Sequence, residues 1–194
     1  RYSAYRKRRH GNSSAGLPPS KFVVCTQNHD QIGNRRLGER LSRLVSFESL
    51  KLAAAAVLLS PYIPLLFMGE EYGETAPFQY FVSHSDEKLV EAVREGRRRE
   101  FEAFAWRGEV PDPQSERTFL DSRLNHALRD QGQHRLLYEF YNELIGIRRR
   151  LFSPLDKRGI RAYASEPDGV VVVERAASVE TALLLHFGER PVSF

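Results

Sequence analysis

From residue 22 the chain reads Phe22-Val23-Val24-Cys25-Thr26, and then Gln27-Asn28-His29-Asp30-Gln31-Ile32-Gly33-Asn34-Arg35. The apolar run is typical of a buried strand, which we place at Lys21 to Thr26. The polar residues form the tip of this strand and lead toward a helical pattern, so the segment is half of a βα unit. In α/β barrels the chemistry is carried by residues at the carboxyl ends of strands. Asp30 therefore lies where an active-site acid is expected.

A helix and a second strand complete the unit. Apolar residues recur at helical spacing from Phe47 to Leu58, Ser46 is placed to cap this helix, and Glu48 suits its first turn. The short apolar run Ile63 to Met68 predicts a second buried strand, in which Pro64 lies near the start, where a missing N–H is tolerated. Strand, helix and strand in this order predict a parallel, right-handed βαβ arrangement.

The remainder of the chain divides into a mixed region, a clear helix and a β-rich end. Between residues 75 and 135 we expect a short helix at Asp86 to Glu95, with loop beyond it, and then a helix from Leu136 to Arg150. Ser153-Pro154-Leu155 marks a domain boundary, because the apolar period changes there from about 3.6 to about 2. Three strands are predicted after it, with a turn at residues 167–169 between the first two: Ile160 to Ala164, Val170 to Arg175 and Ala182 to Phe187.

Composition indicates an ordinary globular protein. The 194 residues are 41% hydrophobic and 28% charged, with a net charge of +4. We expect no nucleic-acid partner, because the excess of positive charge is modest and each arginine run suits a solvated surface or a helix end. No apolar run reaches membrane-spanning length, so no membrane partner is expected either. Cys25 is the only cysteine, which favours a reducing compartment and hence a cytoplasmic location. Because the chain begins at Arg1 inside a basic, aromatic segment, we expect it to be part of a longer protein.

Other chemistries fit the tip after the first strand less well. Asn28, Asp30, Gly33 and Glu39 have the spacing of a calcium loop, but Ile32 stands where an oxygen ligand is needed. A thiol nucleophile formed by Cys25 with His29 is disfavoured, because residues four apart on a strand are roughly 13 Å apart. The six His are scattered, so no metal site is expected.

Two interpretations of the tip remain open on chemistry alone. Asp30 and His29 either stabilise developing charge and hold a hydroxyl group of a substrate, or cap a βα turn. The aromatic residues after the second strand, among them Phe78 and Tyr80, either stack on sugar rings or pin the loop in place.

Several motifs together resemble the α-amylase family of glycoside hydrolases. Gln27-Asn28-His29-Asp30 at a strand tip resembles the fourth conserved region of that family. Further segments resemble a branch of it that acts on maltooligosyltrehalose: Tyr2 to Arg6, Gly38 to Leu41, Phe67 to Glu74, Pro77 to Phe81, Gly96 to Phe101 and Pro111 to Gln114.

The resemblance implies an α/β fold. Residues 1–152 would be the C-terminal part of a (β/α)8 TIM barrel, with its seventh and eighth strands and their helices. Residues 153–194 would begin an antiparallel β-rich domain. A whole barrel needs at least about 200 residues, so this chain has space for only about a quarter of one.

The resemblance also implies a retaining glycosidase that cleaves the α-1,4 bond next to a terminal trehalose. Asp30 matches the carboxylate that stabilises the transition state, and the nucleophile and general acid would lie on strands that this chain lacks. We expect a maltooligosyltrehalose or α-1,4-glucan substrate, no cofactor, and association with the missing N-terminal part of the enzyme. Another enzyme of the family (branching or debranching) and a non-catalytic carbohydrate-binding fragment are the alternatives. The residues expected to bind substrate are His29, Asn28, Gln27, Arg35, Glu71, Phe78 and Tyr80.

Overall fold

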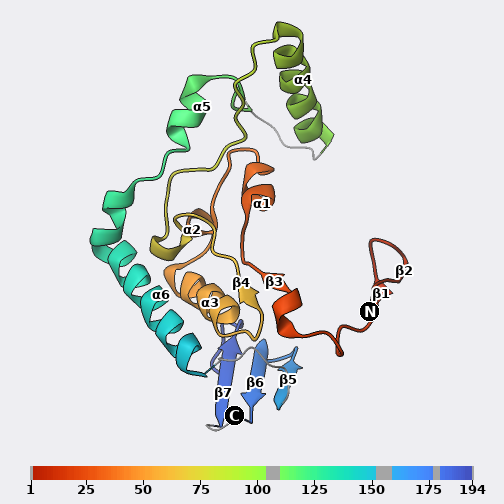
Figure 1. Ribbon diagram of the computed structural model, residues 1–194, viewed down its shortest axis with the longest axis vertical. Coiled ribbons are helices and arrows are strands. Elements are labelled where there is room, and N and C mark those ends of the chain that lie inside the picture. Colours follow the sequence, from red (N-terminus) through yellow and green to blue (C-terminus); the bar gives the residue numbers. More distant parts are fainter. Residues whose placement is uncertain (1, 104–109, 152–158, 177–179, 194) are drawn as a thin grey trace.

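The computed structural model describes residues 2–103, 110–151, 159–176 and 180–193. Its centre is a parallel pair of short strands, β3 (Val23–Val24) and β4 (Ile63–Pro64), joined through helix α3 (Phe47–Leu58) (Figure 1). Val23 pairs with Ile63 and Val24 with Pro64. The predicted parallel βαβ unit is therefore confirmed, but the prediction that its strands are buried is wrong at their first residues, because Val23 is 60% and Ile63 37% exposed.

The two strands are shorter than predicted, although regular parallel hydrogen bonds join them. Lys21 ends a 3-10 turn, η1 (Pro19–Lys21), instead of starting a strand. Ile63 N donates to Phe22 O at 3.0 Å and Leu65 N donates to Val24 O at 2.8 Å. Pro64 lies between these two donors, so its missing N–H leaves no gap in the ladder.

Helix α3 begins and packs as its sequence indicates. Ser46 Oγ accepts from Ser49 N at 3.2 Å, which caps the helix. Its apolar side packs on helix α6 (Gly132–Leu151), which begins four residues before the predicted start at Leu136. The shared core consists of buried residues from both helices: Ala54, Leu58, Leu137, Tyr141 and Leu144.

The β-rich end forms a three-stranded antiparallel sheet of β5 (Ile160–Ser165), β6 (Val170–Arg175) and β7 (Thr181–His186). All three strands and the intervening turn were predicted, and the turn contains Gly169 at a φ of +64°. The sheet lies at the end of the molecule opposite to α4 (Figure 1). The predicted boundary between residues 152 and 153 lies outside the described residues.

One helix is longer than predicted. Helix α4 runs from Glu87 to Ala103, although the sequence indicated an end at Glu95. Residues 94–100 are almost all charged and carry no apolar stripe, but ion pairs three or four residues apart support the helix there. The prediction of loop at residues 104–109 lies outside the described residues, and Pro111 to Gln114 is loop, as predicted.

Smaller elements fill the remaining connections. They are α1 (His29–Gly33), α2 (Leu41–Leu44), η2 (Glu70–Tyr72), α5 (Glu116–Asp121) and η3 (His126–Asp130). No helix in the described part of the chain is long and apolar enough to cross a bilayer.

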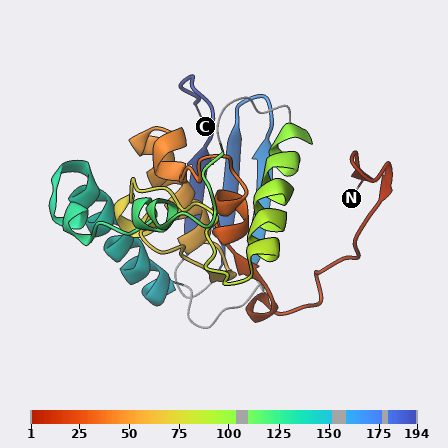
Figure 2. The same ribbon diagram turned by 90° about the horizontal axis from the view of Figure 1, so that it is seen from above.

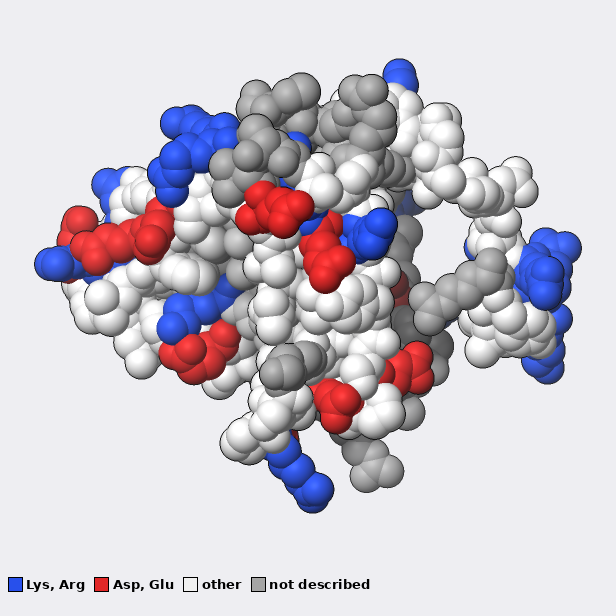
Figure 3. Space-filling view, turned by 90° about the horizontal axis from the view of Figure 1, so that it is seen from below, with Lys and Arg blue, Asp and Glu red and all other residues white. Residues whose placement is uncertain are grey.

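The amino-terminal residues, predicted as loop, form an arm that projects from the body (Figure 2). It carries a small hairpin of β1 (Tyr2–Ser3) and β2 (Arg8–Arg9), in which Tyr2 pairs with Arg9. Lys and Arg side chains gather on this arm, whereas both signs of charge are mixed over the rest of the same face (Figure 3).

Candidate active site

The tip after β3 is a five-residue helix, α1. Asn28 is its N-cap, and its Oδ1 accepts from Gln31 N at 3.0 Å. The capping role that could have fallen to Asp30 therefore belongs to Asn28, and the predicted substrate contact of Asn28 stays a prediction. The side chain of Ile32 is buried and anchors this helix to the body of the protein.

His29 and Asp30 occupy the first turn of α1 and face solvent. Their side chains are 72% and 75% exposed, and His29 Nε2 lies 3.2 Å from Asp30 Oδ1. A carboxylate in the first turn of a helix is favoured by the orphan N–H groups there. The fold thus presents an imidazole and a carboxylate side by side, both accessible to a ligand.

Gln27 connects the tips of the two strands. Its side chain is buried, its Nε2 donates to Glu70 Oε2 at 3.3 Å, and its Oε1 accepts from Leu41 N at 3.0 Å. Both ends of the amide thus bond within the protein, so Gln27 supports the tip. Its direct contact with substrate remains a prediction.

Glu70 is buried beneath this tip with few compensating charges. Its Oε1 also accepts from the Tyr141 hydroxyl at 3.4 Å. Burial raises the pKa of Glu70 to about 7, against the opposing effect of its hydrogen bonds from Phe67, Gln27 and Tyr141. Glu70 is a support of the site, with a proton that titrates near neutral pH.

Glu74 is a buried hydrogen-bond hub. Its carboxylate accepts from Thr75 N and Ala76 N at 2.8 Å each, from Asn125 N at 2.6 Å and from the Tyr72 hydroxyl at 3.1 Å. Burial opposes its ionisation, but these donors outweigh burial and lower the pKa of Glu74. Glu74 therefore fixes the loop after β4, and Glu71 is the half-buried carboxylate beside it.

Arg40 is a second hub, to which the sequence assigned no role. It is 1% exposed, its Nε donates to Ala76 O and its Nη1 to Met68 O, both at 2.7 Å, and its guanidinium lies 5.1 Å from the centre of the Phe67 ring. Burial lowers its pKa. A buried arginine cannot be read from a single sequence, because nothing local separates it from an exposed one. Arg35, a predicted site residue, lies 3.6 Å from Glu39 through its Nε.

Phe78 and Tyr80 lie on the loop after η2. The half-buried ring of Phe78 packs edge-on against Phe67 with a centroid distance of 5.2 Å, and Phe78 N donates to Gly38 O at 2.8 Å. These contacts favour a pinning role for Phe78. Tyr80 is more exposed, and Arg97 lies 4.7 Å from the centre of its ring.

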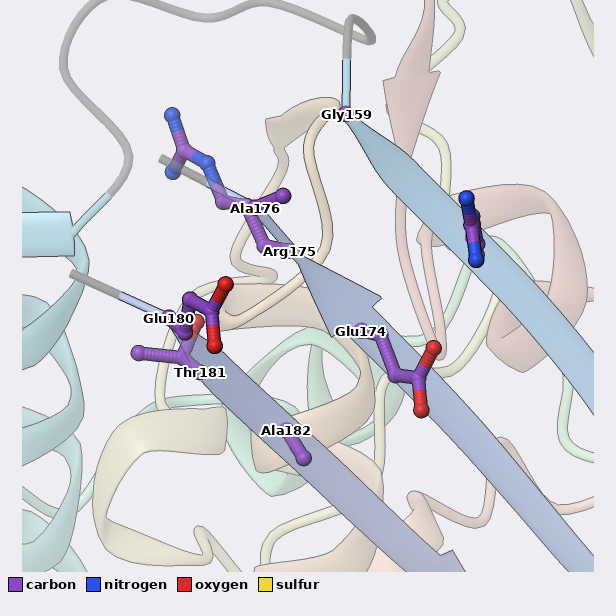
Figure 4. A pocket seen from close by; sticks show the side chains of 8 residues that line it. Gly159, Glu174, Arg175, Ala176, Glu180, Thr181 and Ala182 are labelled. Carbon is purple, nitrogen blue, oxygen red and sulfur yellow. The ribbon is translucent and has the colours of Figure 1, made fainter. Parts of the chain in front are cut away.

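One cavity of about 530 Å³ lies elsewhere, at one end of the three-stranded sheet. Its lining carries both signs of charge, from Arg161, Glu174, Arg175 and Glu180. Figure 4 shows Glu174, Arg175 and Glu180 on the strands that border the cavity. It shares no residue with the tips of β3 and β4, so we do not assign it to the site. Among the described residues, no three His, Cys, Asp or Glu side chains are grouped to hold a metal ion.

Comparison with known proteins gives close matches. A malto-oligosyltrehalose trehalohydrolase of Rhizobium sp. (strain M-11) is 44% identical over 195 residues, which are 99% of this chain and 33% of the relative. Another trehalohydrolase of this name, from Saccharolobus solfataricus, is 52% identical over 149 residues, which are 77% of this chain and 25% of the relative. No protein-family model matches the chain.

A solved structure matches nearly the whole chain. The crystal structure of a Salmonella typhimurium protein assigned as an alpha amylase superposes with a TM-score of 0.86 at 36% identity. It covers 97% of this chain and 32% of that protein.

The chain is thus similar over nearly its whole length to a solved structure assigned as an alpha amylase. Its sequence is similar to malto-oligosyltrehalose trehalohydrolases, as the combined motifs indicated. The chain spans about a third of the length of the first of these relatives and a quarter of the second.

Proposed function

We propose that this chain is part of a retaining glycosidase that hydrolyses the α-1,4 bond next to the terminal trehalose of maltooligosyltrehalose. The observation that carries this proposal is the exposed His29–Asp30 pair at the tip of β3, in a chain whose relatives bear the name trehalohydrolase. In this proposal β3 and β4 are the seventh and eighth strands of a (β/α)8 barrel. The parallel pairing of β3 with β4 around α3 supports that assignment.

Asp30 would stabilise the positive charge that develops on the sugar ring in the transition state. The carboxylate of Asp30 is accessible to a ligand and lies beside the imidazole of His29. It is therefore preorganised to face the developing positive charge of the sugar. His29 would contact a sugar hydroxyl group. Asn28 and Gln27 keep this turn in place, whether or not they also touch the sugar.

The two remaining carboxylates, nucleophile and acid/base, would come from strands outside this chain. We therefore expect the 194 residues alone to be inactive and poorly stable, because two barrel strands leave an unpaired edge. A cytoplasmic location and the absence of a nucleic-acid partner stay predictions.

The test is Asp30→Asn in the protein encoded by the complete reading frame. Loss of one preorganised charge should lower kcat on maltotriosyl trehalose about 10²- to 10³-fold. Asp130→Asn, an exposed substitution on η3, serves as the control and should keep normal kcat. An Asp30→Asn enzyme with near-normal kcat would overturn the assignment of Asp30.

Product analysis of the same enzyme tests the substrate. Release of free trehalose supports the proposal. Formation or loss of an α-1,6 branch indicates a branching or debranching enzyme instead. Glucan binding without any turnover by the complete protein indicates a non-catalytic carbohydrate-binding role.

A further inference from the structure

Helix α4 lies next to α1 in both views and forms the end of the molecule away from the three-stranded sheet (Figures 1 and 2). A second arm, residues 82–114, carries this helix, and hydrogen bonds join the two ends of this arm. Val82 N donates to Pro113 O at 2.8 Å, and the Gln114 side chain exchanges two hydrogen bonds with the backbone of His84, at 3.0 and 3.2 Å. Arg94 of α4 adds a bidentate pair with Asp112, at 2.9 and 2.8 Å. The arm from Val82 to Gln114 is thus braced internally at its base.

Arg97 joins this arm to α1. Its Nη2 donates to Gly33 O at 2.8 Å and its Nη1 to Asn34 Oδ1 at 3.2 Å. The guanidinium lies 4.7 Å from the ring centres of both Tyr80 and Phe101, and the side chain is only 12% exposed. Glu100 pairs with the same Nη1 at 2.7 Å. A planar group held by two rings and a carboxylate has a fixed orientation, which a solvated arginine lacks.

The contact falls where α1 most needs support. A helix of five residues is marginal on its own, and its last carbonyl groups have no partner within the helix. A cation at that end is also favoured by the helix dipole. Arg97 supplies both the donor for Gly33 O and the positive charge.

The path from this contact to Asp30 is a single hydrogen bond. Asn34, whose side chain Arg97 holds, donates its backbone N–H to Asp30 O at 3.3 Å. Asn28 fixes the other end of the helix. We propose that Arg97 is a positioning residue, which acts through Gly33 and Asn34 to hold the Asp30 carboxylate and the His29 imidazole in their working orientation. This inference rests on the proposed function of Asp30.

The experiment is a double-mutant cycle in the complete enzyme. Arg97→Met keeps the length of the side chain and removes its donors, so kcat on maltotriosyl trehalose should fall about 10- to 100-fold, with KM little changed, because a small misplacement of a reacting group is enough for such a loss. Arg97→Lys should not restore kcat, because one ammonium group cannot reproduce the fork that reaches both acceptors. The matched control is Arg98→Met on the same helix, whose side chain is 57% exposed and pairs with Glu95. It should keep normal kcat.

The second half of the double-mutant cycle places Arg97→Met in the Asp30→Asn background. If Arg97 acts by placing Asp30, its loss should lower kcat by less than about twofold there, because residues that act as a unit are not additive. Full multiplication of the two losses, or normal kcat in Arg97→Met alone, overturns the proposal. The Asp30→Asn single variant separately reports on the proposed function. If Arg97→Met does not fold, Asn34→Ala removes one anchor from an exposed position, and it should lower kcat in the same direction.

Discussion

Gln27 Nε2 lies 3.3 Å from Glu70 Oε2, which ties the segment between β3 and α1 to the first residue of η2. The two residues are 43 positions apart in the chain. Both side chains are buried, so this hydrogen bond joins the segments that follow the two strands away from solvent.

Stability should depend on pH through Glu70. Its pKa is raised from 4.5 to about 7 by burial, so between these values the folded protein holds a proton that the unfolded chain has released. The folded state then binds more protons, and the free energy of unfolding falls as pH rises from about 4.5 to about 7, by on the order of 3 kcal/mol. Glu70→Gln removes this fall. Urea unfolding at pH 5 and pH 8 should show that the free energy of unfolding of Glu70→Gln, relative to that of the wild type, is higher at pH 8 than at pH 5.

The control for this prediction is Glu143→Gln, a change of one exposed carboxylate on α6. Its difference from the wild type should be the same at both pH values. An equal difference at pH 5 and pH 8 for Glu70→Gln as well would contradict the buried, protonated state of Glu70.

Loss of Glu74 should be among the most damaging single changes in the chain. Glu74→Ala leaves four donors without their acceptor, three of them backbone N–H groups of Thr75, Ala76 and Asn125. We expect a loss of about 3 kcal/mol or more in the free energy of unfolding. Glu71→Ala, at the half-buried neighbouring carboxylate, should lower stability by less than about 1 kcal/mol. Equal losses of unfolding free energy in the two variants would contradict the role of Glu74 as a hydrogen-bond hub.

The effect of Glu74 on acid stability has the opposite sign to that of Glu70. Because the pKa of Glu74 is lowered in the folded protein, its contribution is present above the unfolded value of 4.5 and is lost as pH falls through the folded pKa. The stability difference between wild type and Glu74→Ala should therefore shrink in acid, which unfolding at pH 3 and pH 6 measures.

A pair of glycines offers a matched test of backbone strain. Gly38 has a φ of +67°, and an added Cβ would lie 2.6 Å from the backbone of Phe78, so Gly38→Ala should destabilise the protein by more than about 1 kcal/mol and displace the loop that carries Phe78. Gly96 lies within α4, where an added Cβ meets no atom within 4 Å apart from the backbone of its own helix and its two chain neighbours. Gly96→Ala should stabilise by about 0.5 to 1 kcal/mol. Thermal unfolding of both variants checks the opposite signs, and a neutral Gly38→Ala would contradict the close approach to Phe78.

Local patterns account for the elements that the sequence could predict. The cap at Ser46, the apolar stripe of α6 and the alternation in β5 to β7 each depend on neighbours within a few residues, and all were confirmed. The second half of α4 was missed because its stabilising ion pairs leave no apolar period to detect. Pattern predicts a helix only where burial on one face imposes the period.

The site was predictable in its exposed part and not in its support. The motif around His29 and Asp30 indicated a functional tip, and the fold presents both side chains to solvent. Gln27 bonds Glu70 at 43 residues away, Arg40 bonds Ala76 at 36 and Arg97 bonds Gly33 at 64, so no local signal separates these three from ordinary polar side chains. Positions 40 and 97 both lie in segments that carried the family resemblance, which is the one signal that could have drawn attention to them.

Arg148 closes the junction between α3 and β4, and its loss should loosen the βαβ unit without touching the candidate catalytic turn. Its Nη1 donates to Leu58 O at 2.7 Å and to Ser60 O at 2.6 Å, and its Nη2 donates to Tyr62 O. Arg148→Met keeps the packing of the stem and leaves three carbonyl groups without this donor, so the free energy of unfolding should fall by about 2 to 4 kcal/mol. Thermal unfolding of the complete protein should therefore show a lower Tm. Arg149→Met, at the exposed neighbouring position, should shift Tm by no more than about 2 °C. If the two variants have the same Tm, the three carbonyl groups find other hydrogen-bond donors without Arg148, which would contradict the prediction.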